Sequence, residues 1–100
     1  MPFQHLSCDA LKNSLADKKT FNIIDIRDQA SYAAGHIEGA VHIDNGNVGA
    51  FVQQADKLIP LVVCCYHGNS SQSAADYFSE QGFRETYSLD GGFEHWKTLG

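Results

Sequence analysis

The sequence predicts an α/β domain whose parallel sheet is covered by helices on both faces. Short apolar segments alternate along the chain with segments that have helical spacing or helix-capping residues, a pattern typical of βαβ units. The apolar segments, such as residues 61–65, are short, mostly continuous runs, as expected of strands buried on both faces. In open sheets of this class, ligands bind beyond the carboxyl ends of the strands.

Five strands are expected, at residues 3–5, 21–26, 40–43, 61–65 and 85–89. Between the first two, Ser7 is the expected N-cap of a helix, because its hydroxyl can accept from a free N–H of the first turn. Lys18 and Lys19 are expected at the C-terminal end of that helix, where the dipole favours cations. Asp28 is expected to cap a short second helix that ends at Gly35.

Three more helices are expected in the second half. The apolar residues of the first have helical spacing, although two glycines weaken the pattern: Val48, Phe51, Val52 and Ala55. Residues 71–81 predict a helix that buries Ala74, Ala75 and Phe78 and stops at Gly82. Gly91 and Gly92 open a last helix that carries two aromatic core residues, Phe93 and Trp96.

Length and composition predict one domain over residues 1–100. Apolar residues make up 43% and charged residues 19%, which is ordinary for a globular protein. No apolar stretch has the length of a membrane span. The net charge of −5 argues against binding to nucleic acid or to anionic membranes. The N-terminus has no basic region followed by an apolar run, which argues against a signal peptide and favours a cytoplasmic protein.

The three cysteines, Cys8, Cys64 and Cys65, make neither a disulfide framework nor a zinc pattern. We therefore expect free thiols and no bound metal. Cys65 begins a loop between an expected strand and an expected helix, where backbone N–H groups converge. Such donors, with the helix dipole, favour a thiolate over the thiol. Cys65 is therefore the predicted nucleophile, whereas Cys64 is expected to pack in the strand and face away, and Cys8 is expected to be incidental.

The loop after Cys65 is expected to hold an anion through its backbone: Tyr66, His67, Gly68, Asn69 and Ser70. Gly68 permits positive φ or close approach, and Asn69 tolerates left-handed backbone. Ser70 is expected to cap the following helix, and the Ser70 and Ser71 hydroxyls are expected to help stabilise the thiolate. Tyr66 is expected to contribute its amide.

Three motifs together resemble the rhodanese family of sulfurtransferases. They are the loop Cys-Tyr-His-Gly-Asn-Ser at 65–70, Asp-Ile-Arg at 25–27 with Tyr-Ala-Ala-Gly-His-Ile-Glu-Gly-Ala at 32–40, and Asp-Gly-Gly-Phe-Glu-His-Trp at 90–96. The similarity runs from about residue 5 to the end. It implies a single rhodanese domain with a five-stranded parallel sheet, and a cysteine persulfide as the intermediate.

The resemblance also implies an activity: transfer of sulfur from thiosulfate to cyanide, or to a thioredoxin-like dithiol, through a persulfide on Cys65. This is ping-pong chemistry without a separate cofactor. Ser70 departs from the family pattern, because many rhodaneses carry arginine in this loop. The resemblance further marks His36 as a structural residue held by backbone hydrogen bonds. Asp25 and Arg27 are interpreted as an internal ion pair and not as an acid–base pair.

Two other functions share this loop. A phosphatase or arsenate reductase would need an arginine six positions after the cysteine to hold an oxyanion with two hydrogen bonds, and Ser71 stands there. A persulfide carrier or sulfur-sensing module with little turnover would use the same cysteine and the same loop. Steady-state thiocyanate production separates an enzyme from such a carrier.

Overall fold

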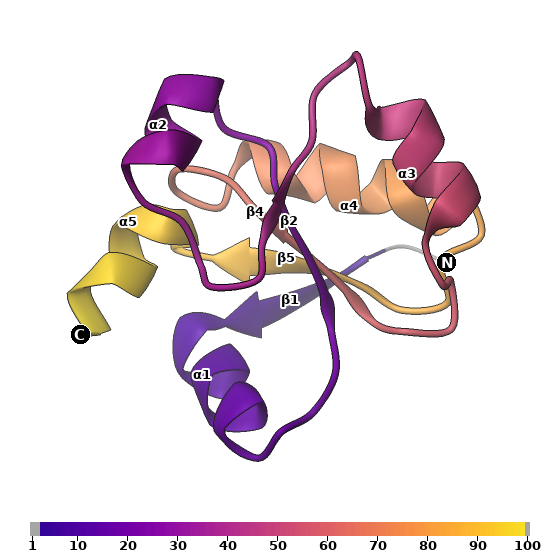
Figure 1. Ribbon diagram of the computed structural model, residues 1–100. Helices are drawn as coiled ribbons and strands as arrows, with labels where there is room; N and C mark the ends of the chain where they lie inside the picture. Colours follow the sequence, from indigo (N-terminus) through magenta and orange to yellow (C-terminus); the bar gives the residue numbers. More distant parts are fainter. Residues whose placement is uncertain (1–2, 100) are drawn as a thin grey trace.

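The computed structural model describes residues 3–99, and its sheet has five strands (Figure 1). These are β1 (Gln4–Ser7), β2 (Asn22–Asp25), β3 (Val41–His42), β4 (Leu61–Cys64) and β5 (Thr86–Asp90). The strand order is β1-β5-β4-β2-β3, and all four neighbouring pairs are parallel. The predicted parallel α/β architecture is therefore confirmed. Among the described residues, no helix has the length and apolarity needed to cross a membrane.

Helices cover both faces of the sheet (Figure 1). They are α1 (Cys8–Ala16), α2 (Gln29–Ala34), α3 (Val48–Gln54), α4 (Ser70–Glu80) and α5 (Gly92–Trp96), followed by the 3₁₀ turn η1 (Lys97–Leu99). Two apolar clusters fill the spaces between helices and sheet, because adjacent strand residues point to opposite faces. Val62 packs with Leu11 of α1 on one face, and Val63 packs with Phe78 of α4 on the other.

Two predicted N-caps are confirmed. The side chain of Ser7 accepts a hydrogen bond from the N–H of Ala10 over 3.1 Å, and that of Asp28 accepts from the N–H of Ser31 over 3.0 Å. Lys18 and Lys19 lie at the C-terminal end of α1, as expected, just beyond its last residue, Ala16, and their N–H groups donate to the carbonyls of Leu15 and Ser14 over 3.0 Å. The chain turns away there, and Lys18 takes a positive φ of 64°.

The register of β2 and β4 positions the site. Asp25 is paired with Cys64, so the chain leaves both strands at the same edge of the sheet. The N–H of Ile26 donates to the Cys64 carbonyl over 3.0 Å, which keeps the two departing segments in contact. Residues that follow β2 therefore lie beside those that follow β4, at the carboxyl edge predicted to bind ligand.

The remaining elements agree with their predictions apart from small shifts at their ends. Helix α4 begins one residue earlier than expected and buries Ala75 and Phe78, while Ala74 is half-buried. Phe93 and Trp96 of α5 pack against the apolar cluster on the α1 face. Their predicted role in the core is confirmed.

Candidate active site

Cys65 is the first residue after β4, and its sulfur is held by two main-chain donors. The N–H of Gly68 lies 3.2 Å from Cys65 Sγ and the N–H of Ser71 lies 3.3 Å from it. Only 3% of the Cys65 surface is exposed. Two N–H groups aimed at one sulfur stabilise a negative charge there. This geometry suits a thiolate or another anionic sulfur species.

Five loop residues are predicted to hold an anion. Among residues 3–99, the N–H of one of them, Gly68, donates a hydrogen bond to Cys65 Sγ. The second donor, the N–H of Ser71, was missed as a backbone donor. The first N–H groups of a helix have no partner within it, and that signal could have identified Ser71 as one of the first residues of α4. The Tyr66 carbonyl accepts from the N–H of Glu94 over 3.1 Å, and the expected contribution of the Tyr66 amide to anion binding stays a prediction.

The predicted cap at Ser70 is wrong, and the Ser71 hydroxyl has a partner other than the Cys65 sulfur, while a contribution of the Ser70 hydroxyl to the thiolate stays a prediction. Asn69 occupies the N-cap position of α4 and makes no side-chain capping bond, and Ser70 is the first residue of the helix itself. The hydroxyl of Ser71 lies 2.7 Å from the hydroxyl of Ser88 in β5, and both serines are fully buried. Ser71 therefore ties α4 to the sheet with its side chain and leaves only its amide for Cys65.

Two glycines let the loop lie directly on the start of α5. The N–H of Phe93 donates to the Cys65 carbonyl over 2.8 Å. A Cβ added at Gly92 would lie 2.5 Å from that carbonyl oxygen, closer than real Cβ atoms come. Gly68 has a φ of +90°, and a Cβ there would lie 2.9 Å from the nitrogen of Gly91. Neither position has room for a side chain, so both set the shape of the loop.

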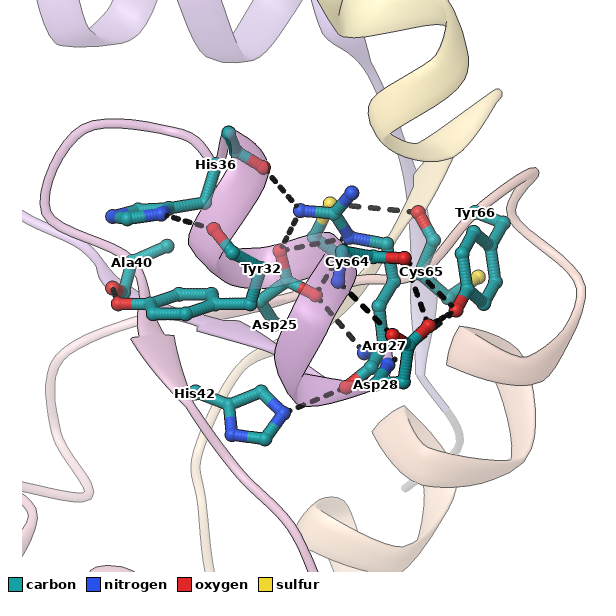
Figure 2. A network of polar contacts seen from close by, with 12 residues as sticks. Asp25, Arg27, Asp28, Tyr32, His36, Ala40, His42, Cys64, Cys65 and Tyr66 are labelled. Atoms are coloured by element: carbon teal, nitrogen blue, oxygen red, sulfur yellow. Dashed lines mark hydrogen bonds and ion pairs between the residues drawn. The ribbon is translucent and has the colours of Figure 1, made fainter.

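Tyr66 links the loop to the start of α2 (Figure 2). Its hydroxyl donates to the carboxylate of Asp28 and lies 3.4 Å from the hydroxyl of Ser31. Hydrogen bonds from Ser31 lower the pKa of Asp28, so that carboxylate is ionised at neutral pH. His67, Asn69 and Ser70 are exposed on the outer side of the loop.

The predicted ion pair between Asp25 and Arg27 is confirmed (Figure 2). Arg27 Nη2 lies 2.7 Å from Asp25 Oδ2, and the two side chains are 3% and 0% exposed. The hydrogen bond to Asp25 is the main reason why the pKa of Arg27 is raised. Nη2 also donates to the Gly35 carbonyl over 2.6 Å, and the guanidinium lies 4.2 Å from the ring centre of Phe93. Arg27 therefore fastens β2 to α2 and α5.

The other two cysteines are free, buried thiols. Burial is the main cause that raises the pKa of both Cys64 and Cys8, which keeps them protonated and unreactive. Cys64 is fully buried in β4, as predicted. Cys8 lies 3.4 Å from the Asp90 carbonyl. His36 Nδ1 lies 2.8 Å from the Tyr32 carbonyl, in agreement with a structural role.

No group of three or more metal-binding side chains is found among residues 3–99. The described geometry thus offers one sulfur in an anion-binding loop, at the carboxyl edge of a parallel sheet.

Comparison with known proteins places this site in a family. The family model for the rhodanese-like domain matches residues 7–99. A protein of Pseudomonas fluorescens named thiosulfate sulfurtransferase GlpE is 62% identical over 76 residues, which cover 76% of this chain and 70% of that protein. A protein of the same name from Shewanella oneidensis is 52% identical over 94 residues, covering 94% and 92% of the two chains.

Solved structures show the same architecture. A rhodanese-like domain protein from Staphylococcus aureus superposes with a TM-score of 0.83 at 24% identity, covering 94% of this chain and 91% of that one. The rhodanese-like domain of an Anabaena protein superposes with a TM-score of 0.85 at 26% identity, covering 96% and 74%. The chain belongs to the rhodanese-like domain family.

Proposed function

We propose that this protein is a thiosulfate sulfurtransferase that works through a persulfide on Cys65, with residues 1–100 acting as a single rhodanese domain in the cytoplasm. The observation that carries the proposal is the pair of N–H donors, from Gly68 and Ser71, on Cys65 Sγ. The names of the relatives, which are thiosulfate sulfurtransferases at 52% to 62% identity, support the same activity.

In the first half-reaction, the Cys65 thiolate attacks the outer sulfur of thiosulfate. A bond forms between Cys65 Sγ and that sulfur, and the sulfur–sulfur bond of thiosulfate breaks. Sulfite leaves with the electron pair of the broken bond, and the terminal sulfur of the new persulfide carries the negative charge. No proton is transferred, so no general base is needed once the thiolate exists.

In the second half-reaction, a thiophilic acceptor attacks the terminal sulfur. Cyanide forms a carbon–sulfur bond, the persulfide bond breaks, and thiocyanate leaves while Cys65 regains its thiolate. A dithiol acceptor takes the sulfur on one thiolate. Its second thiol then closes a disulfide, and the proton of that thiol leaves on the released hydrosulfide. Both routes are ping-pong, and neither needs a bound cofactor, because the acceptor itself supplies the two electrons that reduce the outer sulfur.

The loop supports these steps mainly through its backbone. The same N–H donors can stabilise the thiolate and the persulfide, because both are anionic sulfur. The loop from Cys65 to Ser71 contains no lysine or arginine, and Arg27 is committed to Asp25. We therefore expect thiosulfate to bind weakly, since no fixed guanidinium holds its sulfonate.

Intact mass after incubation with thiosulfate tests the proposal. Wild type is expected to gain one sulfur atom, about 32 Da, and to lose it on addition of cyanide. Cys65→Ser is expected to gain nothing, whereas the control Cys64→Ala is expected to behave as wild type. A gain of one sulfur atom by the Cys65→Ser variant would contradict the proposal. Steady-state thiocyanate production then separates an enzyme from a persulfide carrier.

A further inference from the structure

A cavity of about 700 Å³ lies beside the Cys65 loop, and the proposed chemistry does not use it. Its lining includes apolar residues that follow β2 and β3 and apolar residues of two helices: Ile26, Ile43, Val48 and Phe78. The volume lies in the range of pockets that hold a small ligand or an inserted side chain. Cavities of this kind bind groups with a substantial apolar surface.

Apart from Arg27, the charged groups that line this cavity are acidic. Asp28 and Asp44 contribute two carboxylates, and hydrogen bonds from Ser31 lower the pKa of Asp28. Arg27 is the one lysine or arginine among the lining residues, and its charge is paired with Asp25. Thiosulfate, a small dianion without apolar surface, does not suit such a cavity. A ligand with an apolar group next to a positive charge suits this cavity better.

The cavity is connected to the loop through Asp28, which lines it and accepts the hydrogen bond of the Tyr66 hydroxyl (Figure 2). On α4, the lining residue Ala74 follows Ser70 by one helical turn, about 6 Å along the axis. Tyr77 also lines the cavity, and 42% of its surface is exposed. Tyr77 follows Ser70 by about two turns of the same helix, about 10 Å along the axis, so a molecule that contacts Tyr77 can extend along α4 toward the Cys65 loop.

The low exposure of Cys65 argues for a protein acceptor. Only 3% of this residue is accessible, so a thiol must be guided to it by contacts around the loop. A protein acceptor carries its own side chains next to its thiols, and these can fill a neighbouring cavity. Cyanide is small enough to reach the sulfur without such contacts.

We propose that this cavity docks the protein dithiol that accepts sulfur from Cys65, through an apolar or aromatic side chain next to a lysine or arginine that faces Asp44. The inference deepens the proposed function and rests on it. The chemistry is the dithiol route given above: one acceptor thiolate takes the terminal sulfur, and the second thiol closes the disulfide and gives its proton to the released hydrosulfide.

Matched dithiol peptides test the docking. The first has the sequence Trp-Cys-Gly-Pro-Cys-Lys, and two others replace its Lys by Glu or its Trp by Ala. A hexapeptide extends up to about 20 Å, longer than the stretch of α4 from Ser70 to Tyr77, which is about 10 Å along the axis. With saturating thiosulfate and hydrosulfide release as the readout, KM is expected to be about threefold to tenfold lower for the first peptide than for either of the others.

Two variants locate the effect in the cavity. Asp44→Asn keeps the side-chain oxygen that accepts from the N–H of Gly46 over 2.8 Å but removes the charge. The ratio of KM for the Glu peptide to KM for the Lys peptide is expected to fall about twofold to fivefold in this variant. Asp56→Asn is the matched control, because Asp56 also accepts from an N–H two residues later, that of Leu58 over 2.9 Å, and it does not line the cavity. It is expected to keep the full preference.

Tyr77→Ala is expected to raise KM for the Trp peptide about fivefold and to leave KM for the Ala peptide nearly unchanged. With cyanide as the acceptor, Asp44→Asn and Asp56→Asn are expected to give equal rates. A direct readout is the amide NMR spectrum with the peptide Trp-Ser-Gly-Pro-Ser-Lys, which is expected to shift Val48 and Tyr77 most. That measurement needs no sulfur transfer.

Failure of the docking and failure of the proposed function give different results. If wild type takes up sulfur from thiosulfate and passes it to cyanide, but the peptides show no preference and no shifts at the cavity, the docking inference is overturned alone. If Cys65 never gains sulfur, the proposed function fails and the inference fails with it. If Tyr77→Ala lowers the rate of sulfur transfer equally with cyanide and with the peptides as acceptors, the substitution acts on the loop itself. That result would also overturn the docking inference.

Discussion

Ser71 supports Cys65 with its main chain and the sheet with its side chain. Its N–H donates to Cys65 Sγ over 3.3 Å, while its hydroxyl lies 2.7 Å from that of Ser88. A bond from α4 to β5 therefore fixes the position of the amide that faces the sulfur. The anion-binding geometry depends on how the helix is attached to the sheet, and the identity of the loop side chains matters less.

Ser71→Ala is expected to lower stability more than it changes the reactivity of the sulfur. The variant leaves the buried hydroxyl of Ser88 without its partner, at a cost of about 1–3 kcal/mol, while the amide donor to Cys65 remains. Urea unfolding measures the first effect, and the rate of Cys65 alkylation by iodoacetamide measures the second. Ser71→Ala/Ser88→Ala is expected to recover part of the lost stability, since both hydroxyls are then gone. An undiminished free energy of unfolding in Ser71→Ala would contradict the account.

Alkaline pH is expected to destabilise the fold through Cys64. Burial raises the pKa of this thiol above its ordinary value of 9.0, so above about pH 9 the unfolded chain loses a proton that the folded chain keeps. The contribution of Cys64 to the free energy of unfolding is therefore fully present below about pH 9. Above that pH the free energy of unfolding falls by up to about 1.4 kcal/mol per pH unit because of this group.

Urea unfolding at a series of pH values checks this prediction. Cys64→Ala removes the group, so its stability is expected to fall less steeply above about pH 9 than that of wild type. The other titrating side chains are common to both proteins and cancel in the difference. Parallel curves for the two proteins would refute the assignment to Cys64.

Removing one partner of the buried ion pair is expected to be costly. Asp25→Ala leaves the guanidinium of Arg27, whose side chain is 3% exposed, without its carboxylate. Breaking such a pair costs about 3–5 kcal/mol. Asp25→Leu/Arg27→Met removes both charges and is expected to cost less than Asp25→Ala, because no uncompensated charge is buried. Chemical unfolding of wild type and of the single and double variants measures their free energies of unfolding. A double variant less stable than Asp25→Ala would argue against the electrostatic explanation.

Local patterns predicted the parts of the fold that local interactions determine. The caps at Ser7 and Asp28 follow from short polar side chains placed before helical segments, and both are present. The buried strands follow from continuous apolar runs. Cys65 lies at the carboxyl edge of the sheet, as expected, because it directly follows β4 and all the strands of a parallel sheet end at the same edge, whatever their order.

Contacts between distant segments could not be predicted. The partner of the Ser71 hydroxyl is Ser88, 17 residues away, and nothing near Ser71 in the sequence identifies it. The same holds for the contact between the Tyr66 hydroxyl and Asp28, 38 residues away. The positive φ of Lys18, at which the chain leaves α1, could not be predicted either, because a residue with a bulky side chain rarely adopts it.

Gly92→Ala is expected to damage sulfur transfer through the backbone of the loop. Gly92 has a φ of +59°, and an added Cβ would lie 2.5 Å from the carbonyl oxygens of Cys65 and Tyr66. These atoms belong to the main chain, so the loop must shift to make room. A displacement of about 1 Å at a reacting group can cost about a hundredfold in rate.

Gly39→Ala is the matched control, because Gly39 also has a positive φ, +86°, but an added Cβ meets no atom within 4 Å. Both variants carry the strain of a left-handed alanine, about 1–2 kcal/mol, and only Gly92→Ala carries the clash. Stopped-flow measurement of sulfur uptake from thiosulfate is expected to slow about a hundredfold in Gly92→Ala and to stay near wild type in Gly39→Ala. Equal rates in the two variants would mean that the contact between α5 and the loop does not set the position of Cys65.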